Sequence, residues 1–180
     1  FHFGRTDSKY KAAFSPILYS STRQNEWIGG IMSQLNYTET NYYEQVRHYN
    51  NDLRDKYNTD WAYTMFIVDS HDDPDGLFDD NKSAYAYLGG PFMVMTYDNG
   101  GWGISSMDMI AAHESGHIFW ALDEYNGSFY TGGFTSGYLN GLNGNHQVGG
   151  LLNEPACFMR SGTAVLASNS VCVHSRRQIG

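Results

Sequence analysis

The sequence predicts an α+β domain, because helical and strand patterns both occur along it. Apolar residues at helical spacing predict helices over 40–57 and over 105 to about 122. Short segments rich in aromatic and β-branched residues predict strands over 61–69 and 92–97. The residues after 125 are rich in Gly, Asn and Ser, which predicts an irregular C-terminal part.

The first predicted helix depends on apolar residues that share one face. Thr40 is a suitable N-cap and Asn58 a suitable end for it. Further upstream, residues 14–19 are a candidate short strand, and the glycine pair at 29–30 indicates a turn. The apolar residues of the helix are spaced by four or three positions: Tyr42, Val46, Tyr49, Leu53 and Tyr57.

The composition is that of one globular domain. At 180 residues the chain is long enough for a substantial core and short for two domains. Hydrophobic residues make up 41% of it and aromatic residues 16%, which argues against disorder. We expect a single domain over 1–180, with an upper lobe over about 1–125 and a lower lobe over about 126–180.

The charge excludes several classes of partner. The formal net charge is -8, and the nearest approach to a basic patch is the pair Arg176 and Arg177. Nucleic acids and anionic membranes both require a basic face, so neither is an expected partner. No apolar segment approaches the roughly 20 residues that span a bilayer. We expect a monomer.

The chain begins at Phe1 and shows no signal sequence, as a trimmed piece of a longer precursor does. Cys157 and Cys172 would close a loop of about 15 residues as a disulfide, worth roughly 3 kcal/mol. The alternatives are two buried thiols or two metal ligands, although no second Cys pair supports a structural zinc site. We expect the disulfide, because both cysteines lie in a loop-rich C-terminal stretch that needs a cross-link. The many tyrosines are typical of extracellular proteins, so the chain is expected to be secreted.

The segment His113-Glu114-Ser115-Gly116-His117 predicts a zinc site. Histidines four apart lie on one face of a helix, so both rings reach one ion. Glu114 then lies where it can accept a proton from a water on the metal. By chance, the same letters also occur as two helix histidines beside a solvated glutamate. The surrounding helix is apolar, however, and buried histidines and a carboxylate need a partner.

A catalytic zinc needs a third protein ligand and one open position. Asp123 and Glu124 follow His117 by six and seven residues. A continuous helix would carry Glu124 about 10 Å along the axis, at 1.5 Å per residue, and out of reach. The helix must therefore end and the chain turn back, which makes Asp123 the first choice and Glu124 the alternative.

The spacing His-Glu-x-x-His-x-x-x-x-x-Asp resembles that of the metzincin clan of zinc metallopeptidases, with Asp123 at the position of the third ligand. The segment 157–160 resembles the clan's Met-turn, with Met159 as its methionine. Trp120 stands where the clan has a glycine that ends the helix. The sequence Asp123-Glu124-Tyr125 is also similar to that of secreted bacterial peptidases that cleave immunoglobulin A.

The resemblance implies a twisted mixed β-sheet with a backing helix, an active-site helix and an irregular C-terminal lobe. It implies a zinc endopeptidase of extracellular proteins, with Glu114 as general base. An edge strand would bind the substrate in extended form. Tyr125 and Tyr138 are candidates to stabilise the oxyanion, and the alternative for both is ordinary packing. The residues expected in this edge strand are Phe92, Met93, Val94 and Met95.

Several alternatives stay open. The acidic segment 72–81 offers ligands for calcium or is a solvated loop, and its spacing does not fit an EF-hand. His146 is either a site residue or, as we expect, a surface histidine. A zinc amidase or deacylase, or an adhesion module with a structural metal, would use the same motif. The intact Glu114 disfavours the adhesion module, because a structural metal needs only its ligands.

Overall fold

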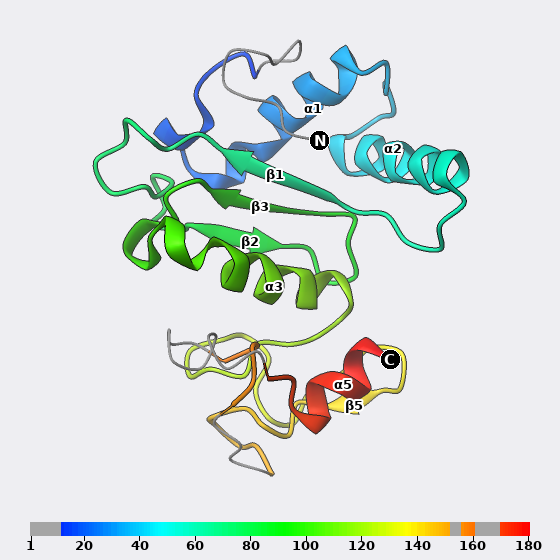
Figure 1. Ribbon diagram of the computed structural model, residues 1–180, viewed down its shortest axis with the longest axis vertical. Coiled ribbons are helices and arrows are strands. Elements are labelled where there is room, and N and C mark those ends of the chain that lie inside the picture. The colour runs from blue at the N-terminus through cyan, green and yellow to red at the C-terminus, as the bar shows by residue number, and fades with distance from the viewer. Residues whose placement is uncertain (1–11, 152–155, 161–169) are drawn as a thin grey trace.

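The computed structural model describes residues 12–151, 156–160 and 170–180, and it confirms the α+β class (Figure 1). Three strands form a mixed sheet, and two very short strands pair lower in the molecule. The helices are α1 (Gln24–Gln34), α2 (Tyr42–Tyr57), α3 (Met107–Ile118) and α5 (Val173–Ile179). The strands are β1 (Thr64–Val68), β2 (Ala84–Ala86), β3 (Phe92–Thr96), β4 (Thr135–Ser136) and β5 (Gly141–Leu142).

The larger sheet has the order β1-β3-β2, with β1 parallel and β2 antiparallel to β3. The expectation that residues 92–97 form an edge strand is therefore wrong. All five residues of β3 are buried, because helices cover both of its faces. A strand of this kind is apolar throughout, and its sequence does not show its place in the sheet. The antiparallel edge strand is β2.

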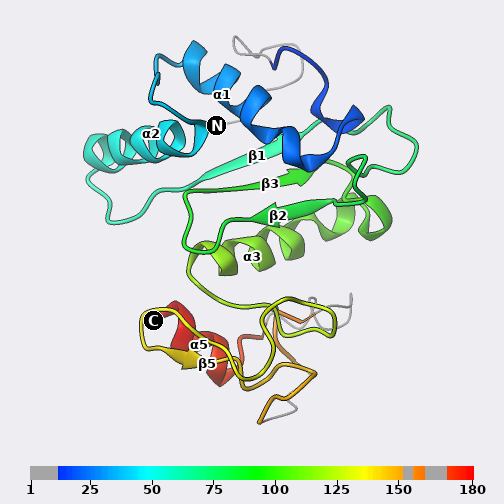
Figure 2. The same cartoon turned by 180° about the vertical axis from the view of Figure 1, so that it is seen from behind.

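The sheet separates two helical layers. Helices α1 and α2 cover one face, and α3 covers the other (Figures 1 and 2). Phe92 and Val94 point to the first layer, while Met93 and Met95 pack with Ile110 and Ile118 of α3. The alternation along β3 thus positions α3 against a rigid sheet, with its C-terminal end directed to the lower part of the molecule.

Helix α2 confirms the helix predicted from apolar spacing, with two differences. Its N-cap is Asn41 and not Thr40: the Asn41 side chain accepts a hydrogen bond from the amide of Glu44 at 3.0 Å. Asn58 ends it in the left-handed conformation, as expected. Tyr57 is 54% exposed, so the last turn leaves the core.

Helix α1 was not predicted, because its glycines indicated a turn. Gly29 and Gly30 lie inside the helix, whose buried residues Trp27, Ile28 and Met32 belong to the core on this side of the sheet. Tertiary packing thus overrides the low helix propensity of glycine. The strand expected over 14–19 is instead a 3-10 turn at Pro16–Leu18.

The described residues after α3 form the lower part of the molecule, which contains α5 and the pair of β4 with β5 (Figure 1). The amide of Tyr138 donates to the carbonyl of Gln178, and that of Leu139 to the carbonyl of Arg177, so the β4–β5 turn is attached to α5. None of the helices in the described ranges has the length and apolar character that crossing a bilayer requires.

Candidate metal centre

Helix α3 ends at Ile118, earlier than its sequence predicts. The amide of Ala121 donates to the carbonyl of Gly116, and the amide of Trp120 to that of His117, each at 2.9 Å. This pair of bonds is a Schellman motif, and it requires a left-handed residue between them. Trp120 supplies it with a φ of 72°. The tryptophan therefore takes the conformation for which glycine is the usual residue, and the chain turns back sharply.

The left-handed conformation costs roughly 1–2 kcal/mol for a residue with a side chain. Contacts with the loop before β3 offset part of this cost. The amide of Gly89 donates to the carbonyl of His117 at 2.9 Å. The indole of Trp120 lies over Gly89, where a Cβ would approach it to 2.4 Å.

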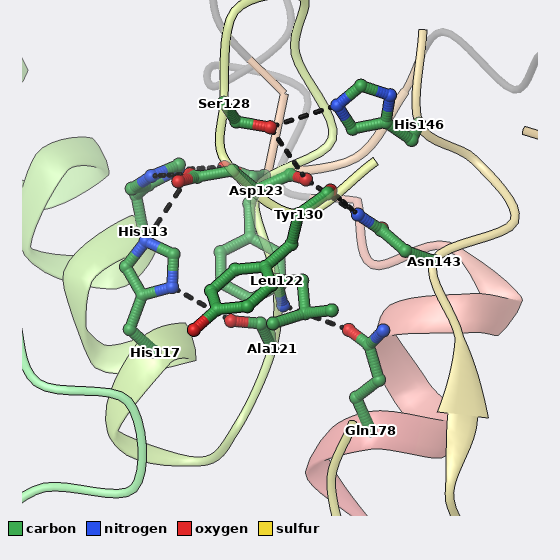
Figure 3. Close-up of polar contacts among 11 residues, drawn as sticks. His113, His117, Ala121, Leu122, Asp123, Ser128, Tyr130, Asn143, His146 and Gln178 are labelled. Carbon is green, nitrogen blue, oxygen red and sulfur yellow. Dashed lines mark hydrogen bonds and ion pairs between the residues drawn. The ribbon is translucent and has the colours of Figure 1, made fainter. Parts of the chain in front are cut away.

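The turn after α3 brings Asp123 to the two histidines. Its Oδ1 lies 3.1 Å from Nε2 of His113 and 3.3 Å from Nε2 of His117 (Figure 3). The side chains of His113, His117 and Asp123 are 12%, 14% and 20% exposed. Three metal-ligating atoms thus converge in a mostly buried place that keeps limited access to solvent.

These separations suit a tetrahedral zinc site. Zinc binds histidine nitrogen and carboxylate oxygen at about 2.0–2.2 Å, which separates neighbouring ligand atoms by about 3.3–3.5 Å. The two Nε2–Oδ1 distances fall within a few tenths of an ångström of that range. Two histidines and one carboxylate also leave the open fourth position that a catalytic zinc needs. The residues present therefore fit this ion.

Each histidine is oriented by its other ring nitrogen. Nδ1 of His113 lies 2.8 Å from the carbonyl oxygen of Phe158, and Nδ1 of His117 lies 2.8 Å from that of Ala121. A carbonyl only accepts hydrogen bonds, so each Nδ1 carries the proton and donates it. In the neutral rings, both Nε2 lone pairs are then free for a metal, as in known histidine–metal sites.

The electrostatics of the site favour a cation where the three side chains meet. Burial lowers the pKa of His113, but the hydrogen bond with Asp123 and the charges of Glu114 and Asp123 raise it to about 9. The pKa of His117 is raised for similar reasons. Burial acts to raise the pKa of Asp123, yet its bonds with both histidines hold it well below the usual range. The structure therefore stabilises positive charge beside Asp123.

Glu114 lies next to the first histidine and is only 7% exposed. Its Oε2 is buried and has no hydrogen-bond partner in the described parts of the chain. Burial raises the pKa of this carboxyl, although the two histidines oppose the rise. A buried carboxylate oxygen without a partner is costly to a fold, which suggests that it serves chemistry here.

Met159 lies beneath α3 and is fully buried. Gly116 makes room for it: a Cβ at Gly116 would lie 2.6 Å from Sδ of Met159 and 2.7 Å from the ring of Phe158. The carbonyl of Met159 also accepts a hydrogen bond from the amide of Glu124 at 2.9 Å. The segment that contains Met159 is thereby attached both to the helix and to the turn that carries Asp123.

Side chains of the Gly/Asn-rich segment after α3 hold the backbone of Asp123 (Figure 3). Asn143 donates to the carbonyls of Asp123 and Tyr130 at 2.8 and 2.7 Å. The Ser128 hydroxyl lies 3.5 Å from the Asp123 carbonyl and 2.9 Å from Nε2 of His146. His146 is only 3% exposed, so the expectation of a surface histidine is wrong. A long Gly/Asn-rich segment was the available signal, since such segments are usually functional.

Glu124 points away from the histidines, so Asp123 and not Glu124 completes their cluster. Glu124 is fully buried beside Cys157 and Cys172. Both cysteines are free thiols, in place of the expected disulfide. Each thiol packs instead against the Ser175 hydroxyl, at 3.3 Å for Cys157 and 3.6 Å for Cys172.

The two candidate tyrosines are placed differently. The half-buried ring of Tyr125 stacks on His113, with centroids 6.3 Å apart. Burial and the charge of Asp123 raise the pKa of the Tyr125 hydroxyl. Tyr138 is 52% exposed, and its ring packs against Trp61. Only Tyr125 therefore contacts one of the clustered histidines.

The acidic segment 72–81 uses several of its carboxylates to fix its own turns. Asp73 accepts from the amides of Asp75 and Gly76, and Asp80 accepts from the amide and hydroxyl of Ser21. Within the described ranges, no residue of this segment belongs to a cluster of His, Cys, Asp or Glu able to hold a metal. The calcium expected there as one alternative has no gathered carboxylate site.

Compared with known proteins, the chain matches no family model, no curated protein and no solved structure. What the protein does is therefore inferred from its own residues and their geometry.

Proposed function

We propose that this protein is a zinc-dependent endopeptidase of the metzincin type. The observation that supports it best is the convergence of Nε2 of His113, Nε2 of His117 and Oδ1 of Asp123, with both Nδ1 atoms anchored to carbonyls. The left-handed turn at Trp120 and the buried Met159 beneath the helix are the further features that such an enzyme needs.

A zinc ion bound by these three residues would act as a Lewis acid that acidifies a water molecule and polarises the scissile carbonyl. Glu114 accepts the proton of the attacking water and later transfers it to the leaving nitrogen. Its burial suits both roles, because a raised pKa makes the carboxylate a stronger base towards the proton of the water. Tyr125, beside His113, is the better placed of the two tyrosines to donate to the developing oxyanion.

A peptide substrate would bind along β2, in place of the strand predicted for this role. Tyr85 pairs with Val94, and the flanking bonds of Ser83 and Tyr87 also go to β3. Hydrogen-bonding pairs alternate along an antiparallel ladder, so the amides and carbonyls of Ala84 and Ala86 face away from β3. They form an edge to which an extended peptide can add as another strand.

An extracellular protein substrate and a secreted location remain part of the proposal. A zinc amidase or deacylase would use the same ligands, but the edge of β2 favours a peptide. The deciding experiment compares cleavage of casein and gelatin by the wild type, Glu114→Gln and Asp108→Asn. Asp108 is an exposed carboxylate on the same helix, so its variant is the matched control.

We expect Glu114→Gln to keep its zinc and to lose about 100-fold or more in activity, the usual worth of a general base. Asp108→Asn should cleave as well as the wild type. Chelation should abolish cleavage, and added zinc should restore it. Equal cleavage by Glu114→Gln and wild type would exclude the proposed mechanism.

A further inference from the structure

A second cluster of metal-ligating side chains lies in the lower part of the molecule. Glu124, Cys157 and Cys172 come from three separate segments, and their ligating atoms all lie within 4.8 Å of one another. They are 0%, 0% and 3% exposed. The cluster lies outside the histidine site, and the proposed mechanism does not use it.

The Ser175 hydroxyl completes the cluster as a fourth donor. Its Oγ lies 2.9 Å from Oε1 of Glu124, 3.3 Å from Sγ of Cys157 and 3.6 Å from Sγ of Cys172. Sγ of Cys172 lies 2.9 Å from the same Oε1. Zinc binds sulfur at about 2.3 Å and oxygen at about 2.0–2.2 Å, which places sulfur and oxygen ligands about 3.5 Å apart. The four atoms therefore need only small displacements to surround an ion.

The charge of Glu124 gives an independent reason for a cation. Its carboxylate is fully buried, and it accepts from Cys172, Ser175 and Asn145, all of which are uncharged groups. A buried carboxylate with uncharged partners is costly, and a metal ion offsets this cost. The guanidinium of the buried Arg160 donates from Nη2 to the Asn145 carbonyl at 2.6 Å, and Asn145 in turn donates to Oε2 of Glu124 at 2.7 Å.

We propose that Glu124, Cys157 and Cys172 bind a second zinc ion, with the Ser175 hydroxyl as fourth ligand. A site closed by four protein ligands is structural. The ion joins three segments: Glu124 lies in the turn after α3, Cys157 lies two residues before Met159, and Cys172 is the N-cap of α5. Glu124 follows Asp123, and Cys157 precedes Phe158, whose carbonyl orients His113. The second ion thus holds two segments on which the histidine site depends.

The experiment counts metal ions in the full chain after purification with zinc and removal of loosely bound ions. We expect two zinc ions for the wild type, and one each for Cys157→Ser, Cys172→Ser and His117→Ala. Val173→Ala, an exposed change in α5 that removes no metal-ligating group, should keep both. A zinc content that is the same in the wild type and in both cysteine variants would refute the proposal.

Cobalt identifies the ligands without relying on the stability of the cysteine variants. In the cobalt-loaded wild type and in His117→Ala, we expect the intense near-ultraviolet absorption of cobalt–thiolate bonds. Ser175→Cys should strengthen this absorption and slow the release of metal to a chelator, because thiolate is the better ligand. A wild type without this absorption, or with an intact mass lower by two hydrogens from a Cys157–Cys172 disulfide, would contradict the proposal.

Discussion

At the scale of single residues, the hydrogen bonds of the two Nδ1 atoms determine how the histidine rings of the site are oriented. The carbonyls of Phe158 and Ala121 fix the rings of His113 and His117, and the Nε2 atoms meet at Asp123. Without metal, the carboxylate of Asp123 stabilises the charged form of both rings. With metal, the same geometry presents neutral nitrogens, so metal binding must release protons.

The metal-free protein should lose stability as pH rises past neutrality. The pKa of His113 is about 9 in the folded chain against 6.5 ordinarily, so its contribution is complete below pH 6.5. This contribution disappears as pH rises through 9, and it is on the order of 3 kcal/mol. Urea unfolding in chelator at pH 6 and pH 9.5 measures it.

Asp123→Asn removes the partner of both histidines and should abolish most of this pH dependence, while Asp108→Asn should keep it. If Asp123→Asn loses as much stability between pH 6 and pH 9.5 as the wild type does, then groups other than Asp123 stabilise the charged histidines.

At the scale of elements, α3 depends on the segments that pack around its end. Trp120 ends the helix in a left-handed turn, and Gly116 admits Met159 and Phe158 against its buried side. Alternating residues of β3 set the position of α3 on the sheet. The position of Asp123 thus depends on Gly116, which contacts Met159 and Phe158, on Gly89, which contacts the indole of Trp120, and on the left-handed backbone of Trp120.

Gly116→Ala should lower the free energy of unfolding by roughly 1–3 kcal/mol, because its Cβ would overlap Met159 and Phe158. Zinc affinity should fall as well, since the carbonyl of Phe158 orients His113. Gly30→Ala is the control: in α1, a Cβ at this glycine meets nothing within 4 Å, so the change should stabilise by about 0.5–1 kcal/mol. Chemical denaturation and zinc titration measure both effects. Unchanged zinc affinity in Gly116→Ala would show that the packing of Met159 and Phe158 against α3 does not control the metal site.

If an extended peptide binds along the outer edge of β2, changes to the amides of this edge should weaken substrate binding. Ala86→Pro removes an amide that faces away from β3 and should raise KM for a long peptide several-fold. Ala86→Gly keeps the amide and should change KM little. Steady-state kinetics on one peptide substrate distinguishes the two variants, and equal KM values for both would remove β2 as the binding edge.

At the scale of the whole molecule, local patterns were predictable and long-range placement was not. The sequence predicted the apolar face of α2 and the grouping of His113, His117 and Asp123, because each of these features lies within a short segment. The place of β3 in the sheet depends on partners distant in sequence, and α1 depends on packing that overrides its glycines. The cluster around Glu124 joins residues up to 51 positions apart, so no local spacing indicated it.

The central claim is that one zinc ion is bound by His113, His117 and Asp123, and anomalous X-ray scattering at the zinc absorption edge tests it most directly. The account predicts an anomalous peak about 2.0–2.2 Å from Nε2 of each histidine and from a carboxylate oxygen of Asp123. A zinc-loaded crystal with no peak among these three atoms would contradict it, whatever other zinc the protein holds.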